Sequence, residues 1–179
     1  MDDELKKKLK ALRLHGLIGC WDDYLKKAEK ENLSYVKLLT HIIDEAYCIK
    51  QESAKQYRLR CAKIPELFRM EIFPFDRQPN LDQRKMKTLY DAGNYLNQPQ
   101  NIIWIGPTGT GKTGLASAFL RQAIEKGLRG KFISFPDLIE TLYQSVGDHS
   151  EAKVIRKFAS YDMLLIDELG YTLKLSRCR

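Results

Sequence analysis

A glycine-rich stretch in the middle of the chain most constrains the fold. An apolar run, Ile102 to Ile105, leads into Gly106-Pro107-Thr108-Gly109-Thr110-Gly111-Lys112-Thr113, and a helical pattern follows at once. This is the phosphate-binding loop pattern G-x-x-x-x-G-K-[ST], in its required context of a strand before and a helix after. The glycines let the backbone approach a phosphate and adopt positive φ.

The loop predicts specific contacts with a nucleotide. Backbone N–H groups of residues 106–113 would line a concavity, and the helix N-terminus would add its partial positive charge. Lys112 is placed to reach the β- and γ-phosphates, and the Thr113 hydroxyl to ligate Mg²⁺. The alternative is a glycine-rich turn that only joins a strand to a helix.

A second polar feature follows the apolar run Met163 to Ile166, where Asp167 and Glu168 stand side by side. Four continuous apolar residues are typical of a strand covered on both faces. Ligands bind at the carboxyl ends of parallel strands. We therefore expect Asp167 to hold Mg²⁺, directly or through water, and Glu168 to act as the base for an attacking water. An acidic strand end with no role is the alternative.

The intervening pattern alternates strands and helices, which predicts a parallel sheet with right-handed crossovers and helices on both faces. A helix capped by Asn80 or Asp82 is expected to run to about Tyr95, with Met86, Leu89 and Tyr90 inward. Further along we expect a helix over 111–126 ended by Gly127, a strand over 131–135, and helices over 138–146 and 151–159.

The first third of the chain predicts a small all-helical module. Helices are expected over residues 3–15, 17–28 and 35–62, with Ser34 as the N-cap of the third. The basic end of that helix, 55–63, contains Tyr57. It could lie along a DNA backbone without reading its sequence, or it could be a solvated face. The third helix is expected to bury one apolar stripe, formed by Leu38, Leu39, Ile42, Ile43, Ala46, Tyr47 and Ile49.

Ile64-Pro65 is expected to stop the long helix, because the residue before a proline is pushed out of the α region. We place the domain boundary there, with a helical module over 1–64 and a nucleotide-binding domain over 65–179. The aromatic segment 65–79 is expected to pack on the second domain. Phe73 or Phe75 could wall an adenine pocket, but core packing is the simpler role.

Bulk composition narrows the class of partner and compartment. The net charge of +7 favours anionic partners, nucleic acid first among them. Four scattered cysteines without a C-x-x-C pair argue against a zinc site or disulfide framework and fit the cytoplasm. No apolar run is long enough to span a membrane.

At this point the sequence resembles the IstB-like transposase helper ATPases, which are related to DnaC-type helicase loaders within the AAA+ class. The resemblance rests on the phosphate loop, on Tyr161-Asp-Met-Leu-Leu-Ile-Asp-Glu-Leu-Gly-Tyr171, on Leu12-Arg-Leu-His-Gly16 and on Phe73-Pro-Phe-Asp76. It implies an AAA+ fold, ATP and Mg²⁺ as cofactors, homo-oligomeric assembly on DNA and stimulation of a cognate transposase. The helical module would mediate contacts with DNA or the partner.

The sequence departs from the family near its end. The family has two more strands, a polar sensor and an arginine finger after the Asp-Glu strand, whereas eleven residues follow Glu168 here, and Ser176-Arg177 stands too close to be that arginine. We hypothesise a C-terminally truncated chain with weak or no ATP hydrolysis. The sensor strand would lie between the phosphate-loop strand and the Asp-Glu strand, so Ile102 to Ile105 is expected to expose unpaired backbone groups.

Three other functions stay open from the sequence. A DnaC-like replicative helicase loader would have the same basic helical beginning. A small-molecule kinase is disfavoured by the adjacent Asp167 and Glu168, because the second carboxylate serves hydrolysis by water. A non-enzymatic role would use only the helical module to bind DNA or another protein.

Overall fold

The computed structural model describes residues 1–65, 68–98 and 100–170. The chain divides into two compact units, Met1–Tyr57 and Arg58–Arg179. No helix among the described residues is long and apolar enough to cross a membrane.

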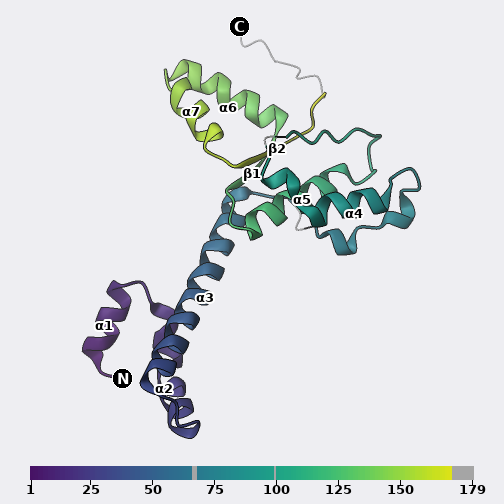
Figure 1. Cartoon of the computed structure of the whole chain (residues 1–179). Helices are drawn as coiled ribbons and strands as arrows, with labels where there is room; N and C mark the ends of the chain where they lie inside the picture. The colour runs from purple at the N-terminus through teal and green to yellow at the C-terminus, as the bar shows by residue number, and fades with distance from the viewer. Residues whose placement is uncertain (66–67, 99, 171–179) are drawn as a thin grey trace. The chain divides into compact units, whose positions relative to one another are not determined.

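The first unit is built from helices, as the sequence predicts (Figure 1). Helix α1 spans Asp3–Ala11, α2 spans His15–Lys30 and α3 spans Tyr35–Ala62, continuing into the second unit. The Ser34 hydroxyl accepts a hydrogen bond from the Lys37 N–H at 3.4 Å, which confirms the predicted cap. The small core of this unit contains Leu9, Leu17 and Tyr24, with Leu38, Ile42 and Ala46 of α3 packed against it.

The prediction of one buried stripe on α3 is wrong for three of its seven members. Leu39, Ile43 and Tyr47 are each about 60% exposed (59%, 64% and 63%). The apolar residues of α3 cover a wider arc than α1 and α2 can cover, so only the side toward Leu38, Ile42 and Ala46 reaches the core.

Leu12-Arg-Leu-His-Gly16 forms the turn from α1 into α2. The Leu14 N–H donates to the Leu9 carbonyl at 2.8 Å, and Arg13 adopts a φ of 57°. A Cβ on Gly16 would lie 2.7 Å from two carbons of Ile49, so glycine lets α2 start against α3. The structure therefore gives this motif a packing role within the helical unit.

After the end of α3, the second unit has short 3₁₀ turns, Met70–Ile72 and Phe75–Arg77, followed by α4 over Gln83–Ala92. The Asp82 carboxylate accepts from the Lys85 N–H at 2.9 Å and caps α4. Helix α4 ends three residues before Tyr95, because Gly93 takes a left-handed conformation with φ of 62°. A third 3₁₀ turn, Asn94–Leu96, follows.

The remaining described elements are helices and strands, with two consecutive helices between the strands. They are α5 (Lys112–Glu125), β1 (Gly130–Ser134), α6 (Phe135–Gly147), α7 (Glu151–Ala159) and β2 (Met163–Asp167). The Gly127 N–H donates to the Ile124 carbonyl, and Gly127 has a φ of 100°, as expected for the residue that ends α5. Helix α6 begins earlier than predicted because the Ser134 hydroxyl caps it by accepting from the Asp137 N–H.

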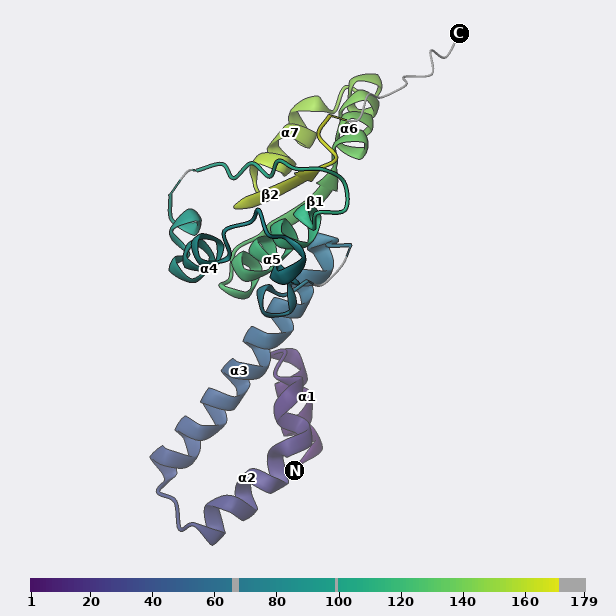
Figure 2. The same ribbon diagram turned by 90° about the vertical axis from the view of Figure 1, so that its right-hand side faces the viewer.

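The sheet has two parallel strands among the described residues, with Gly130 opposite Met163 and Ser134 opposite Asp167 (Figure 2). Helix α5 packs on one face. A Cβ on Gly130 would lie 2.6 Å from a methyl carbon of Leu120, and Phe132 packs beside the same helix. The fold is thus a small parallel α/β unit, an incomplete form of the predicted architecture.

The predicted strand Ile102 to Ile105 is not part of this sheet. Its side chains still alternate: Ile102 and Trp104 pack inward, whereas Ile103 and Ile105 are 78% and 92% exposed. A strand requires a ladder partner, and no other described segment hydrogen-bonds to this one. The expectation of unpaired backbone groups is met among the described residues.

Candidate nucleotide-binding site

The phosphate loop wraps back on itself between the extended segment and α5. The Thr110 hydroxyl and the Lys112 ammonium both donate to the Pro107 carbonyl, at 2.9 and 2.7 Å. A Cβ on Gly106 would lie 3.3 Å from the Thr110 hydroxyl oxygen. These contacts hold the Lys112 ammonium against the loop. Its positive charge therefore lies beside the loop that is predicted to bind phosphates.

Two glycines of the loop have backbone conformations that other residues rarely adopt. Gly109 has a φ of 81° and Gly111 a φ of 80°. Gly111 is also the N-cap of α5, and no side chain caps this helix end. The first N–H groups of α5 therefore have no intrahelical or side-chain acceptor, which is the arrangement that binds phosphate oxygens at helix N-termini.

Aromatic rings lie against the back of the loop. A Cβ on Gly111 would lie 2.7 Å from the Phe73 ring, and one on Gly114 would lie 3.2 Å from the Phe68 ring. Phe73 and Phe75 are each 8% exposed and belong to the same core cluster, 4.8 Å apart between ring centroids. Core packing is therefore the role of Phe73 and Phe75 that the structure shows. Phe68 belongs to the aromatic segment 65–79, which was expected to pack on this domain, although its contact with Gly114 was not predicted individually.

The two glycines offer a matched test of this packing. Gly111→Ala is expected to destabilise the loop more than Gly109→Ala, because both force an L residue to φ near 80° but only position 111 meets a ring. We expect Gly109→Ala to cost about 1 kcal/mol and Gly111→Ala about 1–3 kcal/mol more. Urea denaturation of the two variants measures the difference, and equal losses would contradict the packing role of Phe73.

The carboxyl end of β2 meets the start of α5. The Thr113 hydroxyl donates to Asp167 Oδ2 at 2.8 Å, and the other carboxylate oxygen of Asp167 accepts from the Glu168 N–H at 2.9 Å. Residues 54 positions apart in sequence thus come together at the strand end, where α/β proteins bind ligands. Glu168 is exposed and has a φ of 61°, at the turn that follows β2.

The donor set at this point fits Mg²⁺. A threonine hydroxyl and a carboxylate supply hard oxygen ligands, and Mg²⁺ is usually bound by one or two such groups plus phosphate oxygens and water. No cluster of three or more histidine, cysteine or acidic side chains exists among the described residues. A metal held here would therefore depend on oxygens from a nucleotide as well.

The residues 171–179, which include Ser176 and Arg177, lie outside the described residues. The described part of the site consists of the loop, Thr113, Asp167 and Glu168. The structure brings these predicted residues to one end of the sheet.

A glycine-rich loop that starts a helix beside the carboxylate of a neighbouring parallel strand defines the class of P-loop nucleotide-binding proteins. Comparison with models of known protein families identifies one family within this class. The model of the family described as "IstB-like ATP binding protein" matches residues 7–178, and the chain belongs to this family.

The chain is also similar to individual proteins whose names refer to insertion sequences and ATP binding. The chain is 31% identical over 155 residues to "Insertion sequence IS5376 putative ATP-binding protein" of Geobacillus stearothermophilus, covering 87% of this chain and 61% of the relative. It is 27% identical over 168 residues to "Insertion sequence IS21 putative ATP-binding protein" of Pseudomonas aeruginosa, covering 94% and 63%. The chain thus spans about six tenths of the length of these two relatives.

Proposed function

We propose that this protein binds ATP with Mg²⁺ at residues 106–113 and assists transposition of an insertion element. The observation that supports the nucleotide proposal is the contact between Thr113 and Asp167, in which a hydroxyl and a carboxylate oxygen, both of the kind that Mg²⁺ prefers, come together beside the phosphate loop. The names of the relatives, which refer to insertion sequences and to ATP binding, favour transposition over helicase loading.

Each residue of the site has a role in this proposal. The N–H groups of the loop and of the first turn of α5 bind phosphate oxygens, and Lys112 neutralises charge on the β- and γ-phosphates. Thr113 and Asp167 would hold Mg²⁺, which lowers the charge of the phosphates when it is bound. Glu168 would orient the attacking water and accept its proton.

The proposal includes partners and a location. DNA, bound without sequence preference, and a transposase of the same element are the proposed partners, and assembly on DNA would involve several copies of the chain. The proposed compartment is the cytoplasm, which suits the free, exposed thiols of Cys20, Cys48 and Cys61.

Titration with ATP and with adenosine tests nucleotide binding through the phosphates. The proposed contacts with the nucleotide are made by the loop to its phosphates, which adenosine lacks. Since each hydrogen bond to a charged group contributes about 1.5–3 kcal/mol, adenosine is expected to bind at least about 100-fold more weakly than ATP. Isothermal titration calorimetry measures both. Equal affinities would show that the loop does not recognise phosphates.

Glu168→Gln tests the proposed base. The substitution is expected to lower the rate of ATP hydrolysis about 100-fold or more while ATP affinity stays the same, because an amide cannot accept the proton. Phosphate release measured with saturating ATP gives the rate. A variant as active as the parent would mean that Glu168 is not the base. Glu151→Gln, on α7, is the control with the same change of charge.

A further inference from the structure

Three chain segments of the second unit converge at the amino end of the sheet. The Lys131 ammonium, near the start of β1, donates to the Cys61 carbonyl in the last turn of α3 at 3.2 Å. The start of β2 is joined to the start of β1, because the Asp162 N–H donates to the Arg129 carbonyl at 2.9 Å. Helix α7 ends at Ala159, three residues before Asp162.

Three lysines gather at this point. Lys63 follows the end of α3, Lys131 lies in β1, and Lys157 lies in the last turn of α7. Burial lowers the pKa of the Lys131 ammonium, and the charges of Lys63 and Lys157 lower this pKa further. No carboxylate of the described residues is among the groups that act on Lys131, and no ion pair of Lys63, Lys131 or Lys157 is found in the part of the chain that the structure describes.

Helix dipoles alone do not account for this charge. The carboxyl ends of α3 and α7 each carry the equivalent of roughly half a negative charge. Five cations stand at these two ends: Arg60, Lys63, Lys131, Arg156 and Lys157. The positive charge at this point therefore exceeds the negative charge of the two helix ends, and it would attract an external anion.

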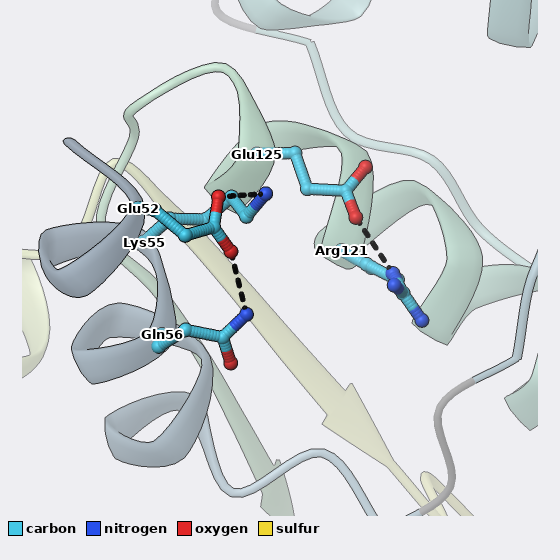
Figure 3. A network of polar contacts seen from close by, with 5 residues as sticks. All are labelled: Glu52, Lys55, Gln56, Arg121 and Glu125. Carbon is cyan, nitrogen blue, oxygen red and sulfur yellow. Dashed lines mark hydrogen bonds and ion pairs between the residues drawn. The ribbon is translucent and has the colours of Figure 1, made fainter. Parts of the chain in front are cut away.

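Two other basic residues differ from this group, because each is paired with a glutamate on its own helix. Lys55 lies 2.6 Å from Glu52, which also accepts from Gln56, so its charge is neutralised on its own helix (Figure 3). Arg121 is likewise paired with Glu125 on α5 (Figure 3). The sequence pattern 55–63 therefore divides into a paired part at Lys55 and a part near Lys63 with excess charge.

We propose that Lys63, Lys131 and Lys157 form a binding site for the backbone phosphates of duplex DNA, at the end of the sheet opposite the nucleotide loop. The two sites lie at opposite ends of β1. The lysines are near Gly130, whereas Ser134, at the other end, pairs with Asp167 of the nucleotide site, and the four residue steps between them are each about 3.3 Å long. The proposal rests on the proposed function in that it gives the DNA partner a surface. It extends the expected DNA contact from the helix end 55–63, which contains Lys63, to Lys131 and Lys157.

The test uses the full chain, in which all three lysines are replaced by glutamine. Binding of a labelled 20-bp duplex is measured by fluorescence anisotropy at several salt concentrations. The triple variant is expected to bind at least about tenfold more weakly at 0.1 M salt, and the slope of log K against log salt is expected to fall by about 2.7, since each phosphate contact contributes about 0.9. An unchanged slope would overturn the proposal.

Matched controls separate the site from general charge and from folding. Lys85, Lys126 and Lys153 are exposed lysines of the same unit, and their triple replacement by glutamine removes the same charge. An equal loss in this control would overturn the proposal. Lys131 is half-buried, so the double variant Lys63→Gln/Lys157→Gln, at two exposed positions, is measured as well and is expected to lower the slope by about 1.8.

Two further measurements identify the phosphate source and keep the proposals distinct. Inorganic tripolyphosphate is expected to compete with the duplex only weakly. If the triple variant loses tripolyphosphate binding and keeps duplex binding, the site belongs to a free polyphosphate and the DNA proposal is wrong. ATP titration of the triple variant is expected to match the parent, so failure of the lysine site leaves the nucleotide proposal intact.

Discussion

Replacing Lys112 with alanine is expected to lower ATP affinity about 10- to 150-fold. The Lys112 ammonium donates to the Pro107 carbonyl at 2.7 Å and supplies the positive charge that the motif directs to the β- and γ-phosphates. A hydrogen bond between charged groups contributes about 1.5–3 kcal/mol, which converts to this loss in the dissociation constant. Isothermal titration calorimetry with ATP measures it directly.

Lys153→Ala is the control for this substitution, because Lys153 is an exposed lysine on α7 and its loss changes net charge equally. ATP affinity of the control is expected to equal that of the parent. If Lys112→Ala bound ATP as tightly as the parent, the loop would not be the phosphate-binding site. An equal loss in both variants would mean that net charge, and not the loop, attracts the nucleotide.

Phe119→Ala is expected to destabilise the second unit by about 3–5 kcal/mol. The Phe119 side chain is 1% exposed, and its ring lies 5.0–5.3 Å from the rings of Tyr90, Tyr95 and Trp104, measured between centroids. Aromatic pairs of this kind contribute about 0.5–1.5 kcal/mol beyond their buried area. Since whole domains are stable by about 5–15 kcal/mol, the loss is a large share of the total.

Urea denaturation followed by circular dichroism measures this effect. Tyr143→Ala on α6 is the control, because that aromatic side chain is 65% exposed and its loss is expected to cost about 0.5 kcal/mol or less. Phe119→Ala unfolding at the same urea concentration as Tyr143→Ala would show that the four rings do not form the core. The loss of Trp104 packing would also free the segment that leads into the phosphate loop.

Local signals in the sequence predicted most of the helices. Helix α3 starts after the Ser34 cap and ends before Lys63, and α7 has the predicted bounds Glu151–Ala159. Caps and glycines act within a few residues, so their effect can be read without the fold. The phosphate loop and the strand end at Asp167 were predicted for the same reason.

Contacts between distant segments were harder to predict. Leu39 and Ile43 match a helical period as well as Leu38 and Ile42 do, and only the packing of α1 and α2 decides which pair is covered. Trp104 belongs to a segment with strand-like alternation, yet forming a strand depends on a partner elsewhere in the chain. The Lys131 contact with Cys61 spans 70 residues, and no periodic pattern signals it.

The most direct test of the central claim measures how Mg²⁺ changes ATP affinity in the parent chain and in Asp167→Asn. Asp167 accepts from Thr113 and would complete the Mg²⁺ ligands. The parent is expected to bind ATP at least about tenfold more tightly with Mg²⁺ than with a chelator, and Asp167→Asn is expected to lose this difference but to keep its affinity without Mg²⁺. An equal gain from Mg²⁺ in both proteins, or no gain in the parent, would contradict it.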